Sequence, residues 1–220
     1  MINNYAVIFD MDGVLSDNSS AHLKSWQKLA DEIGVEFTED FFNQTFGQTS
    51  IKILQKLMQE EVEQEKLREW SERKERYYRK IVKDELEPLP GVKRLIEILN
   101  DHEFNLAVGS SGPRVNIEFL LEALEIKVYF DVIVGAEDVE KGKPDPEVFL
   151  KASDEFNINP RNCVVIEDAP VGITAARRAG MKTIALTTTH EREELQDADL
   201  ILEDLSYLDI DDIYELLLTV

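Results

Sequence analysis

The order of apolar runs along the chain is the feature that most constrains its fold. Ala6-Val7-Ile8-Phe9 form a short, wholly apolar run that ends abruptly at Asp10, a pattern typical of a strand buried on both faces of a parallel sheet. From Pro90 onward, runs of strand length alternate with segments whose apolar residues recur at helical spacing. Repeated strand–helix units of this length predict an α/β fold, a doubly wound, Rossmann-like parallel sheet with helices on both faces.

The expected strands after the first are short and rich in Val, Ile, Leu and Ala. They cover residues 104–108, 132–134, 163–166, 183–186 and 200–202. Helices are expected between them, on apolar positions three and four residues apart. These helices cover residues 92–99, 117–124, 148–156 and 171–179, and a last one runs through Leu216.

The segment between the first strand and Pro88-Leu89-Pro90 has a different character, with no convincing strand. Apolar residues recur at helical spacing over 26–33, where Gly34 offers a stop, and again over 51–58 and 67–81, so the segment is expected to be all helix. We therefore expect an inserted helical cap and a catalytic core, with the cap over residues 17–87 and the core over residues 1–16 and 88–220.

Composition narrows the classes of function. The chain carries 45 acidic and 24 basic residues, for a formal charge of −21, and a field of this sign repels nucleic acid and anionic lipid. No apolar run reaches the roughly 18 residues that span a bilayer, and residues 1–5 lack the basic start and apolar core of a secretory signal. We therefore expect a cytoplasmic, monomeric protein that binds neither nucleic acid nor membranes.

A metal site in this chain would have to be built from oxygen ligands. Cys163 is the only cysteine and cannot form an internal disulfide, and His22, His102 and His190 are too scattered for a zinc site. The spacing also excludes a calcium-binding loop that starts at Asp10, because such a loop needs a glutamate where Ala21 stands.

Polar side chains follow four of the expected strands, and the carboxyl ends of parallel strands meet at one edge of a sheet. They are Asp10 and Asp12, Ser110 and Ser111, Lys143, and Glu167 with Asp168. Taken singly, each fits a turn, a helix cap or a solvated side chain. Together, four converging carboxylates repel one another and require a cation. Hard oxygen ligands beside a substrate phosphate suggest Mg²⁺.

With these motifs the chain resembles the haloacid dehalogenase superfamily, in the branch that contains β-phosphoglucomutase and related phosphatases. The resemblance covers essentially the whole chain. It rests on Phe9-Asp10-Met11-Asp12-Gly13-Val14-Leu15, the serine after the second strand, Gly142-Lys143-Pro144-Asp145-Pro146, and Ile166-Glu167-Asp168 followed by Gly172 and Ala179-Gly180-Met181. This branch carries a mobile helical cap that closes over the cleft, in the position of the predicted insert.

The resemblance implies a role for each motif residue. Asp10 would be the nucleophile that forms an aspartyl-phosphate, and Asp12 would act as general acid and then as general base. Ser110, Ser111 and Lys143 would bind the phosphoryl oxygens. Because the superfamily's dehalogenases and phosphonatases lack the second aspartate, Asp12 favours phosphate ester chemistry.

The resemblance also implies how Mg²⁺ would be held. Its ligands would be the side chains of Asp10 and Asp168 and the main-chain carbonyl of Asp12. Glu167 would lie next to the ion or bind it through water.

Two residues of the expected cap are candidate substrate contacts. Lys74 lies in register with the apolar stripe of 67–81, so it either extends from the edge of a buried face or reaches the cleft, as a similar lysine of the mutase does. His22 is similar to a histidine at the entrance of the mutase cap; the alternative is a histidine on a helix surface.

Gln48 is a third candidate contact, in a loop where the chain departs from the mutase. The mutase has an arginine at the position of Ser50, and that arginine holds the second phosphate of a bisphosphate intermediate. Arg114 could compensate for it from the core side, as a fourth candidate contact.

The sequence therefore predicts an enzyme, a Mg²⁺-dependent phosphatase of small phosphorylated metabolites, with sugar phosphates as the expected substrates. Three alternatives stay open at this point: a β-phosphoglucomutase, an inorganic pyrophosphatase, and a non-catalytic acidic regulator that is phosphorylated on Asp10.

Overall fold

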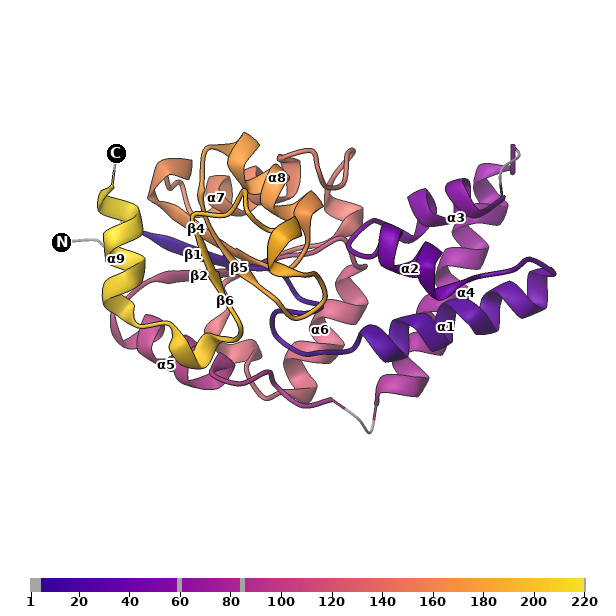
Figure 1. The fold of residues 1–220 in the computed structure, drawn as a ribbon, viewed down its shortest axis with the longest axis horizontal. Helices are drawn as coiled ribbons and strands as arrows, with labels where there is room; N and C mark the ends of the chain where they lie inside the picture. The colour runs from indigo at the N-terminus through magenta and orange to yellow at the C-terminus, as the bar shows by residue number, and fades with distance from the viewer. Residues whose placement is uncertain (1–4, 59–60, 84–85, 220) are drawn as a thin grey trace.

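The computed structural model describes residues 5–58, 61–83 and 86–219. Within them, six strands form one parallel sheet in the order β3-β2-β1-β4-β5-β6 (Figure 1). The strands are β1 (Ala6–Phe9), β2 (Asn105–Gly109), β3 (Val132–Val134), β4 (Cys163–Glu167), β5 (Lys182–Leu186) and β6 (Leu200–Leu202). The predicted doubly wound α/β fold is confirmed, and the predicted strand limits differ by no more than one residue at either end.

Helices cover both faces of the sheet, as the apolar residues of each strand require. One face of β1 carries Val7 and Phe9, and the other carries Ala6 and Ile8. The first face packs against α5 (Val92–Asp101), α6 (Arg114–Ala123) and α9 (Ile210–Leu218), and the second against α7 (Glu147–Glu155) and α8 (Pro170–Ala179). Burial on both faces explains why the strand sequences are continuous apolar runs.

Short 3₁₀ turns complete the connections. They span Lys127–Tyr129, Ala136–Asp138, Pro160–Asn162, Arg192–Glu194 and Leu205–Tyr207. None of the helices in the described part of the chain has the length and apolar character needed to cross a membrane.

The segment between β1 and α5 forms helices, which lie together at one end of the molecule (Figure 1). They are α1 (Ser19–Ile33), α2 (Glu39–Thr45), α3 (Ser50–Met58) and α4 (Gln64–Val82). We call them the cap; the limits 17–87 of a cap domain stay a prediction. A separate apolar cluster, which includes Trp26, Phe42, Leu54 and Trp70, holds these helices together.

The details of the cap follow from local sequence. The α1 helix ends where Gly34 takes a left-handed conformation with φ of 73°, as predicted. The sequence did not single out α2, because its seven residues are too few to show a helical period. Its start is nevertheless marked by Thr38, whose side chain accepts a hydrogen bond from the backbone N–H of Phe41.

Candidate active site

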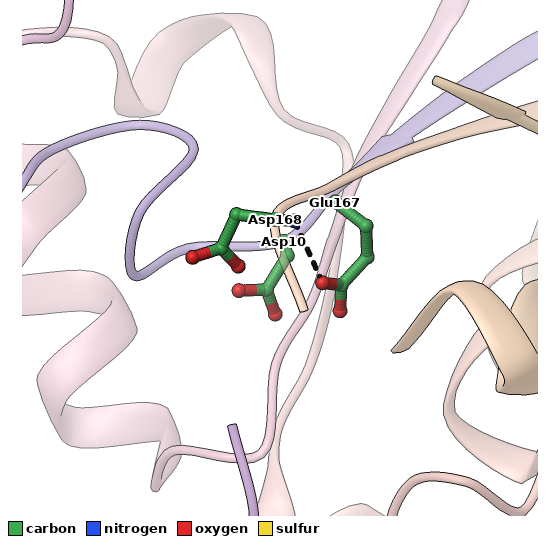
Figure 2. Close-up of side chains that lie close together, drawn as sticks. All are labelled: Asp10, Glu167 and Asp168. Atoms are coloured by element: carbon green, nitrogen blue, oxygen red, sulfur yellow. Dashed lines mark hydrogen bonds between the residues drawn. The ribbon is translucent and has the colours of Figure 1, made fainter. Parts of the chain in front are cut away.

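Three buried carboxylates meet at the carboxyl ends of β1 and β4 (Figure 2). The two strands are parallel neighbours with Phe9 opposite Ile166, so Asp10 emerges beside Glu167 and Asp168. One oxygen of each carboxylate lies within 4.8 Å of the others. The register of the sheet therefore brings together three of the four carboxylates that were expected to converge; the side chain of Asp12 lies outside this cluster.

Lys143 brings a single positive charge into this cluster from the loop after β3. Its Nζ atom lies 2.5 Å from Asp10 Oδ1 and 2.6 Å from Glu167 Oε1, and the side chain is buried. Burial alone would lower the pKa of Lys143, but Asp10 and Glu167 outweigh it and raise the pKa. The lysine therefore enters the site as a permanent cation.

One lysine does not balance three carboxylates. Burial, with added repulsion from Glu167 and Asp12, raises the pKa of Asp10 to about 8 even though Lys143 opposes the shift. Burial, followed by the charges of Glu167 and Asp10, also raises the pKa of Asp168 well above its usual value. A buried set of hard oxygen donors with more negative than positive charge fits a divalent cation such as Mg²⁺.

The carboxylates of Glu167 and Asp168 are held in fixed positions. Glu167 Oε2 accepts hydrogen bonds from the backbone N–H groups of Asp168 and Ala169, each at 2.8 Å. The residue that caps α8 is Ala169, which leaves the side chain of Asp168 available to the site. The hydroxyl of Thr189 donates to Asp168 Oδ2, a contact that the sequence analysis missed because Thr189 belongs to none of the motifs.

Two glycines leave room for these carboxylates. A Cβ atom at Gly172 would lie 1.7 Å from Glu167 Oε1, and one at Gly13 would lie 2.0 Å from Asp168 Oδ2. Gly13 also has a φ of 82°, a backbone conformation that favours glycine. Both positions belong to the sequence motifs, and the structure supplies the steric reason for them.

Asp12 faces the cap, away from the carboxylate cluster. Its Oδ2 atom lies 3.2 Å from His22 Nε2, and its Oδ1 atom accepts a 2.6 Å hydrogen bond from Asn18 Nδ2. Burial would raise the pKa of Asp12, but His22, Asn18 and Lys74 outweigh it and lower the pKa. The two aspartates of the first motif therefore lie in opposite electrostatic surroundings.

Lys74 reaches this cleft. Its Nζ atom lies 2.7 Å from His22 Nδ1 and 3.1 Å from Glu75 Oε1, and the side chain is buried. His22 is buried as well, with its ring stacked on Tyr78 at 3.9 Å between centroids. The alternatives of an edge lysine and a surface histidine are therefore wrong, and Asp12, His22 and Lys74 form a chain of contacts from core to cap.

A small cavity of about 40 Å³ lies between core and cap. Most of the predicted site residues line it: Asp10, Asp12, His22, Gln48, Lys74, Ser110 and Ser111. The Oγ atom of Ser111 is buried and has no hydrogen-bond partner in the described part of the chain. Ser110 Oγ accepts a hydrogen bond from the backbone N–H of Gly112, which leaves its own proton free to donate. Both hydroxyls can therefore bind an anionic ligand.

Comparison with known protein families agrees with this geometry. The sequence model of the haloacid dehalogenase-like hydrolase family matches residues 7–186. The chain belongs to the haloacid dehalogenase-like hydrolase family. The predicted family is thereby confirmed, and the match spans both the carboxylate cluster and the cap.

Several similar proteins are named sugar phosphate enzymes. The hydrolase is 32% identical over 179 residues to the phosphorylated carbohydrates phosphatase of Thermotoga maritima, covering 81% of this chain and 83% of that one. It is 30% identical over 218 residues to the β-phosphoglucomutase of Bacillus subtilis, covering 96% and 94%. The crystal structure of β-phosphoglucomutase from Clostridium difficile superposes with a TM-score of 0.87 at 28% identity, covering 99% and 97%. These similarities confirm the prediction of an enzyme, a phosphoric monoester hydrolase, and they do not support the alternative of a non-catalytic regulator.

Of the four candidate substrate contacts, His22, Gln48 and Lys74 line the cavity of this hydrolase, and Arg114 does not. Its guanidinium donates to the carbonyl oxygen of Ile133 at 2.7 Å and to Asp138 Oδ2 at 2.8 Å. The prediction that Arg114 replaces the mutase arginine is corrected accordingly, because core acceptors already hold its side chain. At the position of that arginine, Ser50 Oγ donates to Glu75 Oε1 at 2.6 Å.

Proposed function

We propose that this hydrolase is a Mg²⁺-dependent phosphatase of small phosphorylated sugars that works through an aspartyl-phosphate on Asp10. The observation that carries the proposal is the buried contact of Asp10 with Lys143 beside Glu167 and Asp168. The names of the similar phosphatases support the substrate class.

The carboxylate of Asp10 would attack phosphorus, and the bond to the leaving oxygen would break as Asp12 supplies a proton to that oxygen. Asp12 would then take a proton from water, whose oxygen attacks the aspartyl-phosphate and releases inorganic phosphate. The contact with His22 fixes the orientation of the Asp12 carboxylate during both steps. The position of Asp12 toward the cap, outside the carboxylate cluster, supports its role beside the leaving oxygen.

The phosphoryl oxygens would be bound by Lys143, Ser110 and Ser111. The unpartnered hydroxyl of Ser111 and the free proton of Ser110 support this assignment. Asp10, Asp168 and the main-chain carbonyl of Asp12 would hold Mg²⁺, with Glu167 next to the ion or bound to it through water, and the bound cation would supply further neutralisation of the phosphoryl charge. Gln48 and Lys74 line the cavity and would contact the leaving group or the phosphate.

The test is phosphate release from a panel of phosphorylated metabolites, sugar phosphates and pyrophosphate included, with Mg²⁺ or with EDTA. We expect hydrolysis of sugar phosphates that EDTA stops and that Asp10→Asn abolishes. Asp17→Asn is the matched control, because Asp17 is an exposed aspartate of the same loop, and it should retain activity. Equal inertness of the wild type and Asp10→Asn across the panel would overturn the proposal. A preference for pyrophosphate would show that the enzyme is an inorganic pyrophosphatase and not a sugar phosphatase.

A β-phosphoglucomutase is the second candidate, favoured by the similarity to the Bacillus subtilis enzyme over nearly the whole chain and by the contact of His22 with Lys74. The serine at position 50 and the engaged side chain of Arg114 argue against it, because both leave a second phosphate without the expected arginine. Incubation with β-glucose 1-phosphate separates the two: a phosphatase releases inorganic phosphate, whereas a mutase yields mainly glucose 6-phosphate.

A further inference from the structure

The loop that carries Lys143 contacts the cap as well as the core. Lys52 is a half-buried residue of α3 in the cap. Its Nζ atom donates to the carbonyl oxygen of Gly142 at 2.9 Å and lies 3.4 Å from that of Lys143. The ammonium group of Lys52 in the cap thus contacts the backbone of the residue whose own ammonium group lies buried in the site, Lys143.

The core holds the rest of this loop through side chains. Glu147 accepts hydrogen bonds from the backbone N–H groups of Glu140 and Lys141, and Arg178 donates to the carbonyl oxygen of Pro144 at 3.0 Å. Buried backbone carbonyls need such partners. The carbonyl oxygen of Gly142 accepts a 3.3 Å hydrogen bond from the backbone N–H of Asp145, and Lys52 of the cap adds a shorter one and also approaches the carbonyl oxygen of Lys143.

The cap also approaches this loop closely at Gly142. A Cβ atom at this position would lie 2.8 Å from Thr49 Cγ2, so a larger residue would force the two segments apart. Thr49 directly precedes α3, and Lys52 lies in the first turn of that helix. They therefore make a steric contact and a charge-assisted hydrogen bond with the same short stretch of backbone.

We infer that Lys52 is a positioning residue, which fixes the Gly142–Lys143 backbone when the cap lies over the core and thereby aligns the Lys143 ammonium with the reacting phosphoryl group. This inference rests on the proposed function, because it assumes that Lys143 binds the phosphoryl oxygens. Lys52 acts through Lys143 and makes no bond to the leaving group. Displacement of a catalytic group by about 1 Å can cost up to about 100-fold in rate.

Steady-state kinetics of Lys52→Met test the inference. We expect kcat to fall about tenfold with KM changed less than twofold, because the lost alignment matters most in the transition state. The factor should be the same for a sugar phosphate and for p-nitrophenyl phosphate, since both carry the same phosphoryl group. Lys52→Arg should recover most of the rate, because a guanidinium can donate to the same carbonyls.

Lys24→Met is the matched control, since it removes one positive charge from the same cap at an exposed position of α1, and it should leave kcat unchanged. Hydrogen exchange of residues 139–150 gives a second readout, with Mg²⁺ and inorganic phosphate as the probe. Exchange should be faster in Lys52→Met than in the wild type, and unchanged in Lys24→Met.

Three results would overturn the inference: a raised KM with unchanged kcat, a loss that differs between the two substrates, or unchanged exchange of residues 139–150. The variant Lys143→Met distinguishes an error in the role of Lys52 from an error in the proposed function. If Lys143→Met retains full kcat, the proposed role of Lys143 is wrong. If it loses activity while Lys52→Met does not, only the role of Lys52 is wrong.

Discussion

The Nζ atom of Lys143 lies 2.5 Å from Oδ1 of Asp10, although the two residues are 133 positions apart in the sequence. The same ammonium lies 2.6 Å from Glu167, and all three side chains are buried. A buried charge that loses its partner is strongly destabilising. The contact therefore links the stability of the metal-free protein to the proposed chemistry.

Replacing Lys143 with Met should lower the free energy of unfolding of the metal-free protein by about 3 kcal/mol, because Asp10 and Glu167 lose their cation. Mg²⁺ should restore part of this loss. Urea denaturation with EDTA and with Mg²⁺ measures both effects. Lys127→Met, which removes an exposed ion pair with Glu122, should cost less than about 1 kcal/mol. Equal losses of unfolding free energy in the two variants would show that the buried contact of Lys143 contributes no more to stability than an exposed ion pair.

Gly172→Ala should displace the carboxylate of Glu167, since the new Cβ atom would lie 1.7 Å from Glu167 Oε1. The displaced Glu167 would lose its contact with Lys143, so we expect at least a tenfold fall in activity. Crowding of this kind typically costs about 1–3 kcal/mol of stability, which thermal unfolding measures. Gly112→Ala is the stability control, because its Cβ would meet its nearest atoms at 3.4 Å. A melting temperature for Gly172→Ala that matches this control would contradict the steric argument.

The carboxylate cluster could be predicted from the sequence because parallel strands carry the information needed. Each motif follows a recognisable strand, and the register of β1 with β4 places Asp10 beside Glu167 and Asp168. The helical periods of the cap likewise identified α1, α3 and α4. Local pattern and sheet topology are sufficient for this part of the molecule.

Contacts between cap and core could not be predicted in the same way. Asn116 of α6 donates a buried 2.6 Å hydrogen bond to Glu75 of α4, and Lys52 donates to the carbonyl oxygen of Gly142 in the loop that carries Lys143. Glu75, Asn116 and Lys52 belong to none of the sequence motifs. These contacts depend on how the cap lies on the core, which helical periodicity leaves open. The error on Arg114 has a different origin, because both acceptors of its side chain, Ile133 and Asp138, lie in the core, and the sequence around Arg114 does not indicate these contacts.

The stability contribution of Glu75 should depend on pH. Burial would raise its pKa, but Lys74, His22 and Ser50 outweigh it and lower the pKa below the usual value of 4.5. A lowered pKa in the folded state means that ionised Glu75 stabilises the fold above about pH 4.5, and that this contribution is lost as the pH falls through the folded pKa. The difference in unfolding free energy between wild type and Glu75→Gln should therefore be largest near neutral pH and shrink below pH 4.5.

Urea denaturation of both proteins across this pH range measures that difference. Glu72→Gln is the control, since Glu72 is an exposed residue of the same helix, and its difference from the wild type should stay small at every pH. A difference for Glu75→Gln that does not change with pH would show that ionisation of this carboxylate is unimportant for stability.

Thr189 should tune the affinity of the site for Mg²⁺ through its hydrogen bond to Asp168 Oδ2. Groups that orient a metal ligand typically contribute about 10–100-fold to metal affinity. Thr189→Val keeps the shape of the side chain and removes the donor, so the dissociation constant for Mg²⁺ should rise about tenfold while KM for the sugar phosphate at saturating Mg²⁺ changes less than twofold. Calorimetric titration with Mg²⁺ measures the affinity without relying on turnover. Thr188→Val is the neighbouring control and should bind Mg²⁺ like the wild type, so equal affinities in the two variants would remove Thr189 from the metal site.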